Sequence, residues 1–511
     1  MRNQDKEAGL TVIELLITLF IAAAFLVSGY QLYSVIIRDG GESRTQARAS
    51  NLAYDYMQRY AVSASNPCVE QNILTDESVE ADNLSNVQVT VSITCPYSNT
   101  PDVSKISVII KYGSPQKEVS HATYTAGSSV SGPWQSISVG TLHNCAIANG
   151  LAYCWGQGTS GQLGNNSTSN SNVPVAVNTS GVLSGKTITA ISAGVSHSCA
   201  IADGQVYCWG SNSGGQLGNG GTSQSLIPVA VSGNMSTKTA TSISAGWEHS
   251  CAVADGLAYC WGLGTFGRLG NNSTSQQTSP VAVTAAAGIL LNKTVTKITA
   301  GNVHSCAIAD GLAYCWGWNG NGELGDSSTN QSLVPVAVNT SGVLGGKTVT
   351  DINVAASSGT RHSCAVAGGL AYCWGQGAYG KLGNNSVSDS NVPVAVDTSG
   401  VLSGKTISRI SAAVDHSCAV ASSQAYCWGQ GTLGRLGNNS TNQSLVPVAV
   451  DTSGVLSSKP IVAVEGGINH SCAIVHSVTN HAYCWGNNST GQLGDNSANS
   501  SLVPVEVFSL P

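Results

Sequence analysis

The stretch His143–Gly156 reads HNCAIANGLAYCWG, and a closely similar stretch occurs seven times in this chain of 511 residues. Every copy contains His-x-Cys-Ala, a short turn and Tyr-Cys-Trp-Gly. The first cysteines of the copies are at positions 145, 199, 251, 306, 364, 418 and 472, so the period is 52 to 58 residues. Repeats of this length are typical of propellers and solenoids, in which one unit cannot bury its apolar face without its neighbours.

Each copy is predicted to form a β-hairpin. Asn149-Gly150 stands midway between the two cysteines of the first copy, and this dipeptide favours a type I′ turn, in which both central residues have a positive φ. Counting outward places the two cysteines opposite each other on an antiparallel pair, within reach of a disulfide bond. Ser422-Ser423 in the sixth copy is a poor match to this turn, and three extra residues in the seventh copy predict a longer loop.

The cysteines are therefore predicted to form disulfides, each hairpin bond adding about 2–3 kcal/mol on the loop-entropy model. Zinc is an alternative, but a zinc site usually needs a second pair of ligands close by, and none is near in sequence; free thiols are the other alternative. Sixteen cysteines that all have a neighbour indicate an oxidising, extracytoplasmic compartment. The expected pairs are Cys68–Cys95, Cys145–Cys154, Cys199–Cys208, Cys251–Cys260, Cys306–Cys315, Cys364–Cys373, Cys418–Cys427 and Cys472–Cys484.

An apolar outer strand is expected after the Gly-x-Leu-Gly turn and polar loop that follow each hairpin. No such strand precedes the first hairpin, whereas Val503–Val507 follows the last one. We therefore expect Val503–Val507 to complete the first blade and close the ring, which would protect the sheet edges. The predicted fold is an all-β, seven-bladed β-propeller over residues 134–511.

The repeat resembles that of a known family. Gly194–His197, with Trp209-Gly210 and Gly215–Gly218, is similar to the regulator of chromosome condensation repeat, and the resemblance covers about 380 residues. It implies a seven-bladed propeller. Members of this family include a nuclear guanine-nucleotide exchange factor and a secreted bacterial inhibitor of β-lactamases, so the fold alone does not select a function.

The N-terminal region has a different character. Residues 10–37 are largely apolar, with one carboxylate at Glu14, and this length is enough to cross a bilayer. A carboxylate inside such a segment is costly, which makes it a functional candidate. The sequence around Gly9 and Leu10 resembles a type IV prepilin signal, although Leu10 stands where phenylalanine is usual and the leader is not strongly basic.

That resemblance implies a processing pathway. A prepilin peptidase would remove the leader, residues 1–9, by cutting after Gly9 and would methylate the new amino group of Leu10. Glu14 would then pair with the N-terminal amine of another pilin subunit, away from water. Before assembly the chain would sit in the inner (cytoplasmic) membrane. An ordinary signal peptide ending near Ala22–Ala24 and a plain membrane anchor are the alternatives.

Residues 38–118 are expected to form a pilin-like α+β head, with a long N-terminal α-helix on a small antiparallel sheet. Residues 87–94 and 105–112 alternate between apolar and polar side chains, as half-buried strands do. Residues 119–133 are rich in Ser, Thr and Gly and are expected to be a linker.

Composition limits the partners of the propeller. Only 9% of the residues are charged, against about 25% in ordinary soluble domains. From residue 131 onward there are 12 basic and 14 acidic residues, which disfavours a nucleic-acid partner. No catalytic set, metal site or cofactor motif is found in the sequence, so no enzyme activity is expected. The seven repeat histidines share one position, and we expect them to bond to the backbone.

Positions that differ among the copies are the candidates for binding. The residue just before each Gly-x-Leu-Gly turn is Ser160, Gly214, Phe266, Asn321, Tyr379, Leu433 or Thr490. Aromatic residues with arginine at loop tips are typical of binding anchors, although scattered aromatic packing is an equal alternative and the loops could open on two faces. The candidate ligand-binding residues, on the third to fifth blades, are Trp247, Phe266, Arg268, Trp318, Arg361, Tyr379 and Lys381.

These features favour a minor type IV pilin or pseudopilin on the cell surface. It would display an extracellular propeller, at the filament tip, for adhesion to an unknown extracellular protein or glycan. The alternatives are a structural pseudopilin for pilus assembly or secretion and a binding propeller of the protein-inhibitor type.

Overall fold

The computed structural model describes residues 70–81, 84–95, 103–126, 134–283, 289–356, 361–476 and 480–508, together with six helical residues between positions 45 and 56. The chain divides into two compact units, residues 1–130 and 131–511. The predicted leader, the apolar segment 10–37 and the processing residues Gly9, Leu10 and Glu14 lie outside the described residues and stay predictions. In the part of the chain that is described, no helix is long and apolar enough to cross a membrane.

The first unit contains a four-stranded antiparallel sheet in the order β1 (Gln71–Ala81), β2 (Leu84–Thr94), β3 (Val103–Tyr112) and β4 (Lys117–Ala126). Alternate residues of β2 are buried, and the helical residues Ala49 and Ala53 join the same core cluster. The predicted strands at residues 87–94 and 105–112 fall within β2 and β3. Cys95 is disulfide-bonded; Cys68, its predicted partner, lies outside the described residues.

One boundary differs from the prediction. The first part of the expected linker, residues 119–133, belongs to β4, which pairs with β3 from Tyr112↔Lys117 to Val103↔Ala126. The Ser and Thr content suggested a linker, but Val, Tyr and Thr are also strand formers, and β3 offers a full-length partner.

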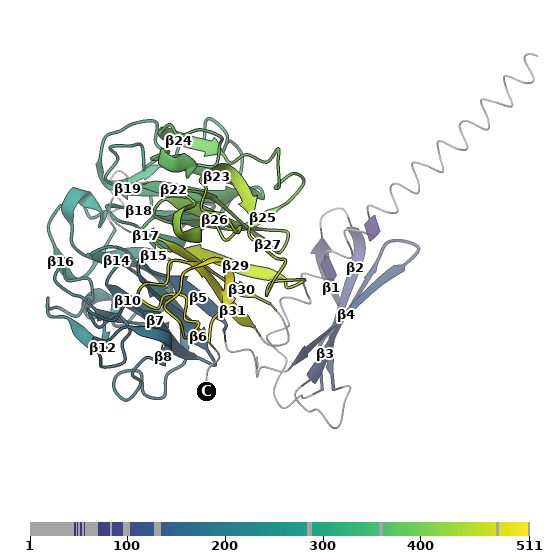
Figure 1. Ribbon diagram of the computed structural model, residues 1–511. Coiled ribbons are helices and arrows are strands. Elements are labelled where there is room, and N and C mark those ends of the chain that lie inside the picture. The colour runs from purple at the N-terminus through teal and green to yellow at the C-terminus, as the bar shows by residue number, and fades with distance from the viewer. Residues whose placement is uncertain are drawn as a thin grey trace, which may run out of the picture. The chain divides into compact units, whose positions relative to one another are not determined.

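The second unit is the predicted seven-bladed propeller, with blades formed by seven four-stranded antiparallel sheets (Figure 1). The inner strands of successive blades contact one another around the ring. The strands, blade by blade, are β5 (Ser136–Val139), β6 (His143–Ala148), β7 (Leu151–Gly156) and β8 (Ser171–Ala176); β9 (Ile188–Ala193), β10 (His197–Ala202), β11 (Gln205–Gly210) and β12 (Ser225–Ala230); β13 (Ala240–Ala245), β14 (His249–Ala254), β15 (Leu257–Gly262) and β16 (Gln277–Ala282); β17 (Val295–Ala300), β18 (His304–Ala309), β19 (Leu312–Gly317) and β20 (Ser332–Ala337); β21 (Val349–Val354), β22 (His362–Ala367), β23 (Leu370–Gly375) and β24 (Ser390–Ala395); β25 (Ile407–Ala412), β26 (His416–Ala421), β27 (Gln424–Gly429) and β28 (Ser444–Ala449); β29 (Ile461–Gly466), β30 (His470–Val475), β31 (His481–Gly486) and β32 (Ser501–Glu506).

The central hairpin of each blade has the register that its turn dictates. In the first blade Cys145 lies opposite Cys154, and Asn149 and Gly150 have φ values of 51° and 73°. Ser422 and Ser423 adopt the same positive φ, at 48° and 61°, although they are a poor match for it. All seven hairpin cysteine pairs are disulfide-bonded, with Cα atoms 4.0–4.1 Å apart.

The expected strand exchange at the point of ring closure is wrong. Val503–Val507 overlaps β32, and β32 pairs with β31 of the seventh blade, not with the first blade. The first blade has its own outer strand, β8. Each blade is therefore a continuous segment of chain, and no strand is exchanged where the ring closes; loop main-chain bonds cross the seam instead, such as the one from the N–H of Asn496 to the carbonyl of Asn172 at 2.9 Å.

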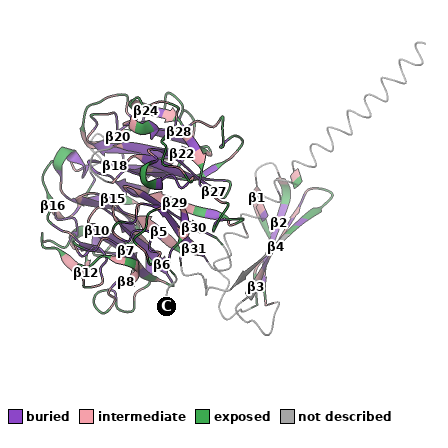
Figure 2. Ribbon diagram, in the orientation of Figure 1, coloured by how far each residue is buried: buried purple, intermediate pink, exposed green. Residues whose placement is uncertain are grey.

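In the propeller each hydrophobic core is formed by residues of two neighbouring blades, as Cys145 and Trp209 show for the first and second blades. Figure 2 shows that the propeller strands are largely buried. The tryptophan of Tyr-Cys-Trp-Gly is fully buried in every copy. Gly164, in the turn of the first blade, packs against Trp209 of the second: it has a φ of 69°, and an added Cβ would lie 2.6 Å from the indole nitrogen. A residue with a side chain could not take this place, which explains why the turn ends in glycine.

Candidate functional site

Each repeat histidine links its blade to the next one. His143 Nε2 lies 2.8 Å from Ser198 Oγ, and Ser198 donates its own proton to the carbonyl oxygen of Gln162 at 2.9 Å. Because the serine proton is used there, the histidine donates through Nε2–H. The other serine-linked pairs, at 2.7–2.9 Å, are His197–Ser250, His249–Ser305, His304–Ser363, His362–Ser417 and His416–Ser471.

Burial keeps these histidines neutral, since desolvation disfavours the charged imidazolium. It lowers the pKa of His143, His197, His304 and His470 to about 3 and holds the pKa of the other three well below the ordinary value. The seven Nδ1 atoms are buried without a hydrogen-bond partner among the described residues. The expected backbone-bonding role is thus wrong in detail: the side chains bond to hydroxyl groups of the next blade, and their role is structural.

The seam between the seventh and first blades uses longer side chains. His470 Nε2 donates to Asn144 Oδ1 at 2.8 Å, where the other six joints have serine. On the inner strands, the N–H of Ala193 donates to Ser138 Oγ at 3.0 Å, whereas at the seam the N–H of Val139 donates to the carboxylate of Glu465 at 2.9 Å. Asn144 and Glu465 therefore hold the ring closed where no strand crosses.

No group of side chains suitable for a metal ion is found among the described residues. Glu465 lines the central channel with Lys297, and burial raises the pKa of its carboxyl to about 7. The raised pKa follows from burial at the seam, and the hydrogen bond from Val139 acts in the opposite direction by favouring the ionised carboxylate. The repeat histidines and Glu465 together provide no nucleophile with an adjacent base.

The loops that follow the hairpins contain the side chains that differ most among the seven blades. In each Gly-x-Leu-Gly turn we call x the turn residue and the residue two positions earlier the tip residue. The main-chain carbonyl of every turn residue accepts a bond from the indole of the next blade, as Gln162 does from Trp209 at 2.9 Å. The turn residues, all at most 3% exposed, are Gln162, Gln216, Arg268, Glu323, Lys381, Arg435 and Gln492.

A Gln or Glu turn residue fixes the loop by accepting a hydrogen bond. The N–H of the tip residue Ser160 donates to Gln162 Oε1 at 2.8 Å. The tip residues Gly214, Asn321 and Thr490 donate in the same way to Gln216, Glu323 and Gln492 at 2.8–2.9 Å. None of these four tip residues has a positive φ.

An Arg or Lys turn residue produces a different loop. The Nε of Arg268 donates to the carbonyl of Thr265 at 3.0 Å, and Arg435 bonds Thr432 equivalently at 3.1 Å. The tip residues of the three loops with a cation, Phe266, Tyr379 and Leu433, have φ values of 62–64°. A bulky residue in this left-handed region costs about 1–3 kcal/mol and persists only where its surroundings enforce it.

The reason for the two loop forms is the direction of one peptide group. Gln or Glu needs the N–H of the tip residue to point inward, whereas Arg needs the preceding carbonyl to point inward. Turning that peptide over reverses the sign of φ at the tip residue. The turn residue therefore decides whether the tip residue has an ordinary or a left-handed backbone.

Five of the predicted ligand-binding residues form one continuous stack across the third to fifth blades. The guanidinium carbon of Arg268 lies 5.9 Å from the ring centres of both Trp247 and Phe266. Phe266 meets Trp318 edge to face with centroids 4.9 Å apart, and the guanidinium carbon of Arg361 lies 5.4 Å from the Trp318 ring. Such contacts are favourable cation–π and aromatic interactions.

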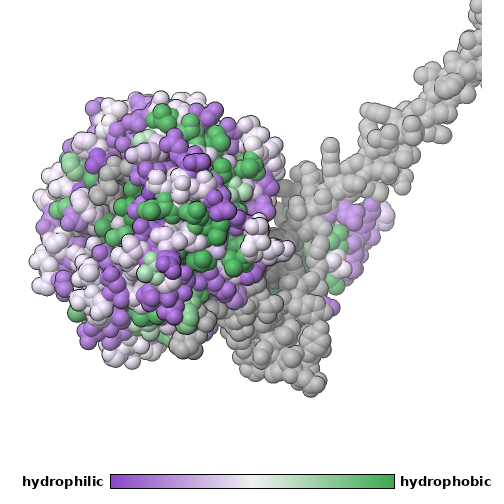
Figure 3. All heavy atoms as spheres, viewed as in Figure 1, coloured by the Kyte–Doolittle hydropathy of each residue, from purple (hydrophilic) through white to green (hydrophobic). Residues whose placement is uncertain are grey.

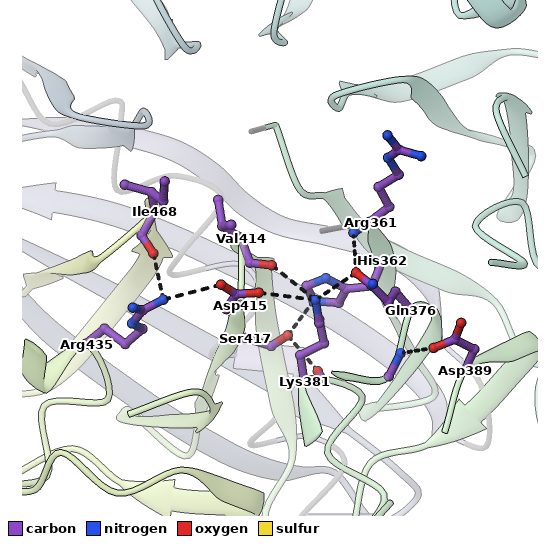
Figure 4. A network of polar contacts seen from close by, with 11 residues as sticks. Arg361, His362, Gln376, Lys381, Asp389, Val414, Asp415, Ser417, Arg435 and Ile468 are labelled. Atoms are coloured by element: carbon purple, nitrogen blue, oxygen red, sulfur yellow. Dashed lines mark hydrogen bonds and ion pairs between the residues drawn. The ribbon is translucent and has the colours of Figure 1, made fainter. Parts of the chain in front are cut away.

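Of the other two predicted residues, Lys381 belongs to a neighbouring polar network on the fifth and sixth blades (Figure 4), and Tyr379 is the tip residue of the same loop. Lys381 Nζ lies 3.4 Å from Asp415, which is also 3.9 Å from Arg435. Gln376 connects this network to the stack, because its Oε1 accepts bonds from the N–H of Arg361 and from Lys381 Nζ at 3.3 and 3.2 Å.

The two classes of loop lie on the same face. Arg268 donates to the carbonyl of Asn302, Lys381 to that of Val414, and Arg435 to that of Ile468, with distances of 2.9–3.5 Å. Each of these acceptors lies in the loop before a repeat histidine. The turn loops and the histidine loops thus contact each other, which excludes the expectation of two separate faces.

Arg268 and Lys381 are not surface anchors, as the sequence had suggested, because both are at most 1% exposed. Burial lowers the pKa of Lys381 to about 8 and that of Arg268 to about 10. Phe266, Tyr379 and Leu433 are the exposed members, at 38%, 42% and 42%. Leu433 was not among the predicted site residues; its place directly before Gly-Arg-Leu-Gly, which matches Phe266 before Gly-Arg-Leu-Gly, is the signal that could have found it.

The remaining surface is polar but weakly charged. Figure 3 shows hydrophilic and hydrophobic residues mixed over the visible face of the propeller. With 9% charged residues in the whole chain, most of the polarity comes from uncharged side chains. A cluster that combines exposed aromatic rings with guanidinium groups is therefore unusual for this protein.

Comparison with known proteins identifies the same repeat family that the sequence resembles. Residues 111–473 match the RCC1-like domain, and residues 480–511 match the regulator of chromosome condensation (RCC1) repeat. The ultraviolet-B receptor UVR8 of Arabidopsis thaliana is 32% identical over 323 residues, which are 62% of this chain and 69% of the receptor. The E3 ubiquitin-protein ligase HERC2 of Homo sapiens is 30% identical over 371 residues, which are 71% of this chain but only 7% of the ligase.

Solved structures share the fold. Human WBSCR16 superimposes with a TM-score of 0.60 at 21% identity, covering 70% of this chain and 95% of that one. Prp20p of Saccharomyces cerevisiae, which binds Gsp1p and histones, superimposes with a TM-score of 0.55 at 22% identity, covering 65% and 80%. At these identities the likeness shows the architecture alone.

Proposed function

Because this chain belongs to the regulator of chromosome condensation (RCC1) repeat family, we propose that it is a binding propeller without catalytic activity, whose partner is a protein. The observation that carries this proposal is the stack of Trp247, Arg268, Phe266, Trp318 and Arg361 on one face. Tryptophan, tyrosine and arginine are the residues most enriched at the centres of protein interfaces.

The structural relatives support a protein partner rather than a small molecule. Prp20p binds Gsp1p and histones, and yeast RCC1 has been solved bound to Kap60. The central channel includes Ile and Val residues in its lining but exposes mainly polar surface, with Glu465 and Lys297 among the lining residues, whereas small-molecule pockets are usually lined mostly by hydrophobic and aromatic side chains.

The test is adhesion of a host strain that lacks the gene and is complemented with variants. Trp247→Ala and Tyr379→Ala should reduce adhesion at least about tenfold, the size expected for losing a contact of roughly 1.4 kcal/mol. Ser160→Ala and Thr490→Ala are the matched controls, since they alter tip residues of other blades. Unchanged adhesion with Trp247→Ala and Tyr379→Ala would refute the assignment of the site.

We further propose that a prepilin-type N-terminus carries the propeller outside the cell. Support comes from the sequence around Gly9, Leu10 and Glu14, and from cysteines that are all disulfide-bonded in the described propeller, as is typical of oxidising compartments. Mass spectrometry of native protein should find N-methylated Leu10 only in cells with prepilin peptidase. A start near Phe25, or an uncut Met1, would contradict this proposal.

Loss of adhesion alone on gene deletion would support an adhesin at the filament tip. Loss of the filaments themselves would instead assign the chain to pilus assembly or secretion as a pseudopilin.

A further inference from the structure

The face that carries the stack is divided into two unlike parts. In the third, fifth and sixth blades the tip residue is apolar and exposed: Phe266, Tyr379 or Leu433. In the seventh, first and second blades the tip residue is Thr490, Ser160 or Gly214. The exposed apolar tip residues therefore lie in the third, fifth and sixth blades, with the polar Asn321 in the fourth blade. We call this region the apolar arc and define it by Phe266, Tyr379, Leu433 and the half-buried Trp318.

The division follows the turn residues. Every apolar tip residue precedes a buried cation, Arg268, Lys381 or Arg435, and the loops of the other half all have glutamine. Arg268 and Arg435 are held by the carbonyls of Thr265 and Thr432 in their own loops, and these bonds fix the left-handed backbone of Phe266 and Leu433. Lys381 bonds instead to Gln376, Val414 and Asp415. Replacing either arginine by glutamine would free the peptide to turn and would move the tip side chain.

Beside the apolar arc lies the guanidinium of Arg361, which is near enough to the carboxyl group of Glu323 to interact with it electrostatically. The Nε atom of Arg361 is buried without a hydrogen-bond partner, and among the residues that the structure describes this side chain forms no ion pair. Its guanidinium extends away from the Lys381–Asp415 network (Figure 4) and stacks on Trp318. In that network a single carboxylate, Asp415, forms ion pairs with both Lys381 and Arg435.

These features determine the chemistry of a suitable partner. A guanidinium with free donors is best satisfied by a carboxylate, which can accept two parallel bonds. The three exposed tip side chains offer apolar contact on the same arc. An uncharged glycan would offer Arg361 no carboxylate, and a basic segment would be repelled by it.

We propose that the apolar arc docks a protein segment in which a carboxylate side chain, held by Arg361, stands beside apolar side chains that pack on Phe266, Tyr379 and Leu433. Arg268 and Arg435 act as positioning residues, because they set the backbone of the tip residues Phe266 and Leu433 without touching the partner. This inference rests on the proposed protein-binding function and specifies its partner class.

The test uses the full chain in detergent and a phage-displayed library of random 12-residue peptides as the probe. The selected peptides should share an acidic residue next to apolar ones. Their affinity should fall at least tenfold with Arg361→Ala and with Leu433→Asn, and should not change with the matched controls Thr490→Asn and Ser160→Asn. Asparagine tolerates a left-handed backbone, so Leu433→Asn removes the apolar group while keeping the loop form.

The positioning role has a separate readout. Arg268→Gln should weaken peptide binding at least tenfold and give Phe266 a negative φ in a crystal structure, while the thermal midpoint does not fall by more than a few degrees. Arg268→Lys should retain most of the binding. A Phe266 backbone that stays left-handed with glutamine at position 268 would overturn the positioning role.

The outcomes separate this inference from the proposed function. Peptides that bind but ignore Arg361→Ala and Leu433→Asn, or that lack acidic residues, would overturn the inference and leave protein binding in place. Binding to arrayed glycans that is lost with Arg361→Ala, together with no selected peptide, would overturn both.

Discussion

Mild acid should unfold the propeller, because its seven repeat histidines are buried and neutral. Their folded pKa values, about 3 for four of them, lie below the ordinary value of 6.5. Below pH 6.5 the histidines of the unfolded chain therefore bind protons, whereas the same histidines stay neutral in the folded propeller. Each such histidine lowers the free energy of unfolding by about 1.4 kcal/mol for every pH unit.

Two carboxyl groups act in the opposite direction. Burial raises the pKa of Glu323 and of Glu465 to about 7, so between pH 7 and 4.5 the native state binds more protons at these groups than the unfolded chain does. They offset two of the seven histidines. The net loss is roughly 7 kcal/mol per pH unit below pH 6.5, comparable to the whole stability of an ordinary domain.

The assay is denaturant unfolding at pH 7.5, 6.5, 6.0 and 5.5, followed by the fluorescence of the buried blade tryptophans. The midpoint should fall steeply below pH 6.5, and the disulfides should remain intact. Histidine-labelled protein should show seven imidazoles protonated at Nε2 that do not titrate while the fold persists. A free energy of unfolding that changes by less than about 1 kcal/mol between pH 7.5 and 5.5 would refute the reasoning.

Three further changes test the closure and bracing of the ring. Asn144→Ala should remove the seam acceptor, leave the facing imidazole N–H of His470 unpaired and cost about 1–3 kcal/mol in denaturant unfolding; an unchanged free energy of unfolding would contradict this role of Asn144. Cys364→Ser with Cys373→Ser should cost about 2–3 kcal/mol in the same assay, and an unchanged midpoint would contradict this bracing role. Glu465→Gln keeps an acceptor but no charge, so it should stabilise the protein at pH 8 and not at pH 5; a loss at pH 8 would show that the ionised group is needed.

The repeat could be predicted from sequence because its causes are local. The Asn149-Gly150 turn sets the register, and the register puts Cys145 opposite Cys154. Ser422-Ser423 shows that the tertiary context can impose the same turn on residues that do not favour it.

The closure could not be predicted from pattern alone. From the order of strands we expected Val503–Val507 to complete the first blade, yet β32 belongs to the last blade. The real signals were substitutions within the repeat: Asn144 where other copies have serine, and Glu465 where Ser138 and Ser192 stand elsewhere. Their meaning depends on a partner more than 300 residues away, so only the three-dimensional arrangement shows it.

The candidate site was found only in part. Comparison among copies identified Trp247, Phe266, Trp318 and Arg361, which the structure brings together. It treated Arg268 as a surface group, because sequence does not distinguish an arginine that points outward from one that holds a loop from within. The left-handed backbone of Leu433 follows from Arg435 beneath it, and that relation is visible only from the hydrogen bonds.

The most direct test of a protein-binding arc is site-specific photocrosslinking in the native host. A photoreactive phenylalanine derivative would replace Tyr379 in one strain and Thr490 in another, since both are tip residues of the same face and only Tyr379 belongs to the apolar arc. The account predicts one protein adduct from position 379, lost with Arg361→Ala, and none from position 490. Equal adducts from both positions, or an adduct at 379 that survives Arg361→Ala, would contradict it.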